Sequence, residues 1–104
     1  MTRLDLGFFS RRRWWKPIMS DDLQSIPGVG PSMAQDLRDL GYFKVEDLAG
    51  QNPELMFQNL RLMHGANIDR SVLYVFRCAV YYATEESHEP ELLNWWAWQD
   101  RRLN

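Results

Sequence analysis

The sequence predicts an all-α fold, a compact bundle of about six helices, and three observations support this class. Apolar residues recur at the three- and four-residue spacing of a helix face along most of the chain. No segment alternates between apolar and polar residues for more than a few positions, so no strand is expected. Proline and glycine stand beside the apolar segments, where they begin and end helices. With 104 residues, 45% of them hydrophobic, the chain is long enough for one domain around a single core.

The first two expected helices flank a glycine turn. Ser20 is suited to cap a short helix over residues 21–26, because its hydroxyl can accept a hydrogen bond from a free amide. The segment 27–30, Pro-Gly-Val-Gly, ends that helix. The next helix should run over residues 31–40, since proline is tolerated at the first helical position. Gly41 supplies the left-handed residue that ends it.

Four further helical segments are expected after this pair. Residues 45–49 predict a single short turn, and Asn52 is suited to cap a helix over residues 53–63. A longer helix over residues 69–84 is apolar nearly all round, so it should form the centre of the domain. Pro90 opens a last helix that extends to about residue 98. Its buried face is expected to carry Leu92, Trp95 and Trp96.

Charge separates a basic arm from an acidic domain. Residues 1–17 hold five basic side chains and one acidic side chain, whereas residues 18–104 hold seven basic and thirteen acidic. We expect an arm over 1–17 and a helical domain over 18–104. The arm interleaves basic and aromatic residues, which suits an anionic partner and suits a solvated tail equally well. The candidate supporting basic contacts are Arg11, Arg12, Arg13, Lys16, Arg38 and Arg70.

Composition argues against several classes of protein. Cys78 is the only cysteine, so no disulfide within the chain and no paired-cysteine zinc site is expected, and the thiol should be buried and inert. The longest apolar run, within residues 72–83, is shorter than the roughly 20 residues that a bilayer needs, which favours a cytoplasmic protein with no membrane partner. His64 and His88 show neither a catalytic partner pattern nor metal-ligand spacing. We therefore expect no enzyme, no metal site and no small-molecule substrate.

The glycine turn at residues 27–30 is the most specific functional signal. Glycine permits a tight turn with positive φ and leaves the backbone uncovered, so amides at the start of the next helix can approach an anion. The turn, the flanking apolar positions, Ala34 and the closing Gly41 together resemble a helix-hairpin-helix motif, which in other proteins holds a DNA phosphate. The resemblance implies a phosphate-binding site at Gly28, Val29, Gly30 and Ser32.

This chain departs from the DNA-binding form of that motif in one respect. A lysine or arginine usually stands early in the second helix, where this sequence has Ser32, Gln35 and Asp36. The segment 64–67 and its two flanking helices repeat the order helix, turn, helix, which suggests a degenerate second hairpin. Two hairpins would make the tandem unit of SAM-like DNA-binding domains. By resemblance only, such a hairpin can also hold a monovalent cation through its carbonyl groups; no other cofactor is expected.

A second resemblance rests on five segments: residues 26–30, 36–41, 45–48, 69–81 and 91–96. On these segments the chain, from about residue 18 to residue 98, resembles the pathogenicity-locus family, small bacterial helix-hairpin-helix proteins sometimes labelled mitomycin resistance. DNA binding through the hairpin is what this resemblance implies about function.

Two interpretations are open for each of three other side chains, Arg77, Trp95 and Trp96. Arg77 is the one charge within the apolar helix, and a buried guanidinium needs a partner. Pairing with an acidic side chain inside the domain is the favoured interpretation, and contact with a phosphate or an acidic partner is the alternative. Trp95 and Trp96 are expected in the core, although they and Trp98 would also suit stacking on bases.

Two functions are therefore expected from the sequence. The first is a non-catalytic, sequence-independent DNA-binding module whose hairpin contacts backbone phosphate. The second is a protein–protein interaction module in which the hairpin is only structural and the acidic domain docks to a larger protein. Phosphate neutralisation by basic side chains is the main source of non-specific DNA affinity, so the net charge of the domain weakens the first expectation.

Overall fold

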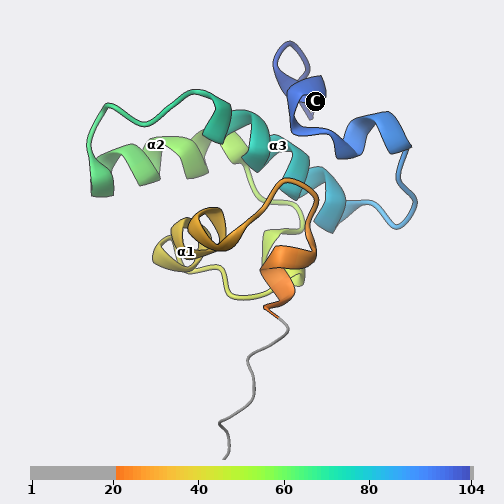
Figure 1. Ribbon diagram of the computed structural model, residues 1–104, viewed down its shortest axis with the longest axis horizontal. Coiled ribbons are helices and arrows are strands. Elements are labelled where there is room, and N and C mark those ends of the chain that lie inside the picture. Colours follow the sequence, from red (N-terminus) through yellow and green to blue (C-terminus); the bar gives the residue numbers. More distant parts are fainter. Residues whose placement is uncertain (1–20, 104) are drawn as a thin grey trace, which may run out of the picture.

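A computed structural model describes residues 21–103 of the chain. This part is all-helical and has no strand (Figure 1). It contains three α-helices rather than about six, because the other three expected helices are 3-10 turns of four residues and the last of them is divided into two such turns. The α-helices are α1 (Pro31–Asp39), α2 (Pro53–His64) and α3 (Ser71–Thr84). The 3-10 turns are η2 (Asp22–Ser25), η3 (Val45–Leu48), η4 (Pro90–Leu93) and η5 (Trp95–Trp98).

The short segments are 3-10 turns because each has room for a single turn. In η2 the cap is Asp21, whose side chain accepts a hydrogen bond from the Leu23 amide at 3.2 Å. The turn ends at Ile26, whose own amide bonds to the Leu23 carbonyl, and Pro27 follows with no N–H. The expected cap Ser20 and the arm over residues 1–17 lie outside the described residues.

Local chemistry explains both ends of α2, where Asn52 is the expected cap, and the start of α3. Asn52 accepts hydrogen bonds from the amides of Glu54 and Leu55, which caps α2. Gly65 ends that helix with φ 101°, a conformation that L side chains rarely adopt. Asp69 accepts from the Ser71 amide at 2.9 Å at the start of α3.

Helix α3 forms the centre of the domain, which confirms the interpretation of its apolar sequence. It packs against α2, η3 and η5, and it runs between them in Figure 1. Eight of its side chains are buried, and Phe76, Cys78 and Ala79 are completely inaccessible to water. None of the helices within residues 21–103 is long and apolar enough to cross a membrane.

The C-terminal segment differs from the single helix expected over residues 90–98. Asn94 is extended and separates η4 from η5. A 3-10 helix has three residues per turn, so Trp95 and Trp98 lie on one face of η5 and Trp96 lies on another. The α-helix expected from the sequence would instead have had Trp95 and Trp96 on its buried face. Trp98 is 2% exposed, and its indole N–H donates to the Leu92 carbonyl at 2.9 Å. The expectation that Trp96 lies in the core was wrong, because its side chain is 59% exposed.

Candidate nucleic-acid interface

Contacts of Gly28 and Val29 hold the glycine turn before α1 in place. Gly28 has φ +87°, and a Cβ added there would lie 3.4 Å from Cδ1 of Trp95. The Val29 amide donates to the Ile26 carbonyl at 3.0 Å, and the Val29 side chain is 5% exposed. Val29 therefore anchors the turn in the core and has no free amide for a phosphate, unlike the expectation from the motif.

The N-terminus of α1 is open to solvent. Gly30 is the N-cap and offers no side-chain cap, and Pro31 has no amide hydrogen. Within residues 21–103, the amides of Gly30, Ser32 and Met33 donate no hydrogen bond. Ser32 is exposed, and no acidic residue occupies the first turn. Free amides and the positive end of the helix dipole make this position suited to an anion.

A pocket of about 170 Å³ between α2, α3 and the C-terminal segment gathers basic side chains. Of the seven arginine and lysine residues in the domain, four line this pocket, and Glu54 is the one acidic residue among the lining residues. Guanidinium groups bind phosphate oxygens well because their donors form a planar fork. The four are Arg61, Arg70, Arg77 and Arg102.

Arg77 is the buried member of this group, with an exposed fraction of 3%. Its Nε donates to Glu54 Oε2 at 2.7 Å, and its Nη1 donates to the Trp98 carbonyl at 2.8 Å. The favoured interpretation, pairing inside the domain, is therefore confirmed. The guanidinium also lies 5.7 Å from the ring centroid of Tyr74. Arg77 thus fixes the C-terminal segment against α2 and α3 and forms the inner wall of the pocket.

The other basic residues expected to contact DNA have different surroundings. Arg70 is exposed and lines the pocket at the start of α3. Arg38 donates to Asp21 Oδ2 at 2.7 Å, and this hydrogen bond holds the pKa of the Asp21 carboxyl below its ordinary value. Arg38 is therefore engaged in an ion pair. The arm residues Arg11, Arg12, Arg13 and Lys16 lie outside the described part of the chain.

The sequence did not predict that Arg61 and Arg102 would lie together. They are 41 positions apart, and only the packing of α2 against the C-terminal segment brings them to one pocket.

Cys78 and His88 make contacts that support the fold. Burial raises the pKa of the Cys78 thiol to about 11, which disfavours the reactive thiolate and agrees with an inert core cysteine. The His88 ring stacks on Tyr82 with the centroids 4.8 Å apart, and its Nε2 is hydrogen-bonded to the Tyr82 carbonyl.

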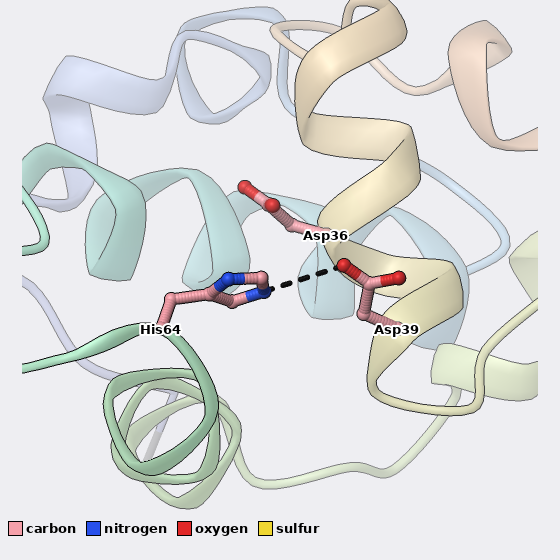
Figure 2. A group of neighbouring side chains, drawn as sticks. All are labelled: Asp36, Asp39 and His64. Carbon is pink, nitrogen blue, oxygen red and sulfur yellow. Dashed lines mark ion pairs between the residues drawn. The ribbon is translucent and has the colours of Figure 1, made fainter.

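His64 lies beside two carboxylates, a cluster that the sequence did not predict. Its Nε2 lies 3.3 Å from Asp39 Oδ2, and Asp36 points toward the same space (Figure 2). One ligand atom from each of the three residues falls within 4.8 Å of the others. Asp39 and His64 are 25 positions apart, so no local spacing could indicate this cluster.

The described residues thus define a small all-helical domain with an open helix N-terminus and an arginine-lined pocket. The family described as Pathogenicity locus matches residues 18–104, and the chain belongs to this family. The match confirms the family resemblance of the sequence and leaves out the basic arm. No curated protein and no solved structure matched the chain.

Proposed function

We propose that this protein is a non-catalytic, sequence-independent DNA-binding module that contacts backbone phosphate through the turn before α1. The observation that carries the proposal is the open N-terminus of α1, where Gly30 and Ser32 present free amides and Ser32 adds an exposed hydroxyl. In this interpretation η2, the turn and α1 form the hairpin. The helices α2 and α3, joined through Gly65, form the degenerate second one. A cytoplasmic location belongs to the same proposal.

The arginine pocket supports the proposal by supplying local positive charge on an acidic domain. Residues 18–104 carry seven basic and thirteen acidic side chains, so the average field repels a polyanion. Arg61, Arg70 and Arg102 are exposed at the pocket and can neutralise phosphates. Each phosphate neutralised releases counterions, which makes the affinity dependent on salt. The basic arm adds attraction of the same kind.

The test is a fluorescence-anisotropy titration of labelled duplex DNA with the full chain at two salt concentrations. Gly30→Ala is the first variant, because an added Cβ meets nothing within 4 Å and the backbone at φ −97° accepts alanine. The methyl group would keep a phosphate from the α1 amides, so affinity should fall about tenfold while the fold is kept. Unchanged affinity in this variant would exclude the turn as the contact.

A second pair of variants tests the pocket. Arg61→Gln and Arg101→Gln remove the same charge from exposed side chains, but only Arg61 lines the pocket. We expect Arg61→Gln to lower the slope of log affinity against log salt by about 1, as for a lost phosphate contact. Arg101→Gln should change the slope of log affinity against log salt only slightly. Equal effects would mean that net charge alone, and not the pocket, supports binding.

A protein–protein interaction module is the second candidate function, and an exposed apolar face of α2 favours it. Leu55 is 54% exposed and Leu62 is 84% exposed; they are seven residues apart and therefore on one face. Met63, beside Leu62, is 53% exposed. If the full chain binds no DNA at low salt, this face is the place to search for a partner.

A further inference from the structure

Two carboxylates and one imidazole converge from the ends of two helices. Asp36 and Asp39 are three residues apart in the last turns of α1, so they share one face of that helix. His64 is the last residue of α2, and its ring is directed at both carboxylates in Figure 2. One ligand atom from each side chain lies within 4.8 Å of the others. A nitrogen and two oxygens are a donor set that zinc accepts in proteins.

The distances suit one ion shared between these side chains. Two ligand atoms about 2.1 Å from a tetrahedral zinc ion are separated by about 3.4 Å. His64 Nε2 and Asp39 Oδ2 are 3.3 Å apart. Both atoms can therefore bind one ion with little movement, and Asp36 completes a set of three protein ligands.

The electrostatics of the cluster also favour a cation. Asp36 and Asp39 lie at the C-terminal end of α1, where the helix dipole is negative and disfavours carboxylates. His64 lies at the C-terminal end of α2, so a second negative helix end points at the same place. Asp36 is partly buried, so its carboxylate is less hydrated than a fully exposed one. Two carboxylates face one imidazole, so negative charge exceeds positive charge here, and a divalent ion would neutralise it.

A hydrogen-bond chain orients one of the ligands. Gln35 Nε2 donates to Asp39 Oδ1 at 3.0 Å, and Arg38 Nη2 donates to Gln35 Oε1 at 3.2 Å. Arg38 is itself fixed by the ion pair with Asp21. These contacts occupy Oδ1 and leave Oδ2 of Asp39 facing His64. Protein metal sites commonly hold their carboxylate ligands by such outer hydrogen bonds.

We propose that Asp36, Asp39 and His64 form a binding site for a divalent transition metal, with Zn²⁺ as the best match to one nitrogen and two oxygens. Three protein ligands leave a position for water. The ion ties the C-terminal end of α1 to the C-terminal end of α2, and it stabilises the packing of the first helical pair against the second. The site is separate from the turn and from the arginine pocket, so it holds whether or not the protein binds DNA.

Isothermal titration calorimetry of the full chain with Zn²⁺ is the direct test. We expect one ion per chain, and at least a tenfold loss of affinity in His64→Gln and in Asp36→Asn. His88→Gln and Asp100→Asn are matched controls, because they remove the same groups outside the cluster and should keep the affinity of the parent protein. Circular dichroism confirms that each variant folds. Absence of saturable binding, or equal affinity in His64→Gln and His88→Gln, overturns the proposal.

A spectroscopic readout on the unmodified protein guards against variants that fail to fold. Substoichiometric Mn²⁺, added alone, broadens the proton resonances of a histidine that binds it. We expect the ring signals of His64 to broaden before those of His88, which lies in the segment between α3 and η4. That segment and the C-terminal end of α2 are on opposite sides of the domain in Figure 1. Broadening of both rings to the same extent, or of His88 alone, contradicts the site.

Discussion

Glu54→Ala would show how strongly the fold depends on the buried charge of Arg77. The guanidinium is 3% exposed and its Nε lies 2.7 Å from Glu54 Oε2. Removing one partner of a buried ion pair costs about 3–5 kcal/mol, because the other charge is left without compensation. The Glu54 side chain is 35% exposed and the Trp98 carbonyl still accepts from Nη1, so the loss should lie at or below the lower limit of this range. We expect the free energy of unfolding to fall by about 2–3 kcal/mol.

Urea unfolding followed by far-ultraviolet circular dichroism measures this loss. In a domain of this size it corresponds to a melting temperature lower by about 10–20 °C. Glu46→Ala is the matched control, because Glu46 pairs with Lys44 at 3.7 Å while both side chains are more than 60% exposed. Removal of that exposed pair should cost less than about 0.5 kcal/mol.

A double variant separates the cost of the unpaired charge from the loss of the contact. Adding Arg77→Met to Glu54→Ala removes the uncompensated guanidinium, so the double variant should be more stable than Glu54→Ala alone. The reasoning is refuted if Glu54→Ala and Glu46→Ala lose the same stability, or if the double variant is the least stable of the set.

Three further predictions concern the tryptophans, Cys78 and Asp21, and unfolding stability is the main readout of each. Trp98→Ala should cost about 3–5 kcal/mol because the indole is buried, whereas Trp96→Ala should cost less than about 1 kcal/mol, and similar losses would contradict the 3-10 arrangement. Cys78 should resist iodoacetamide in the native protein, and stability should fall as the pH rises from about 9 to about 11, because the folded state keeps a proton that the unfolded state releases. The pKa of Asp21 is lowered by Arg38, so its contribution is present above the ordinary aspartate pKa and is lost as the pH falls below it; Asp21→Asn should flatten the acid limb of the pH–stability curve.

Much of the fold could be predicted because its signals are local. Asn52, Pro53 and Gly65 act on amides and dihedrals within a few residues, and each lies where the expected helix begins or ends. The helical class followed from apolar spacing, and the central position of α3 followed from apolar side chains nearly all round it. The number of α-helices did not, since a four-residue segment can form a 3-10 turn as readily as one turn of α-helix.

The candidate site was predictable only where it is continuous in sequence. The glycine turn and the open end of α1 are read from residues 27–32, although Val29 proved to be a core residue. The arginine pocket and the cluster at His64 were not predicted. Their members come from α1, α2, α3 and the C-terminal segment, and no spacing along the chain encodes which helix faces meet.

The sequence by itself determined closely where α1 and α2 begin and end, which helix is buried, and that a glycine turn precedes α1. These properties depend on dihedral preferences, capping and apolar periodicity over a few residues. Only the tertiary structure decided that Glu54 neutralises Arg77, that Trp98 rather than Trp96 enters the core, and that His64 meets Asp36 and Asp39. Each of these contacts depends on the relative rotation and packing of separate elements, and that arrangement is set by the whole core.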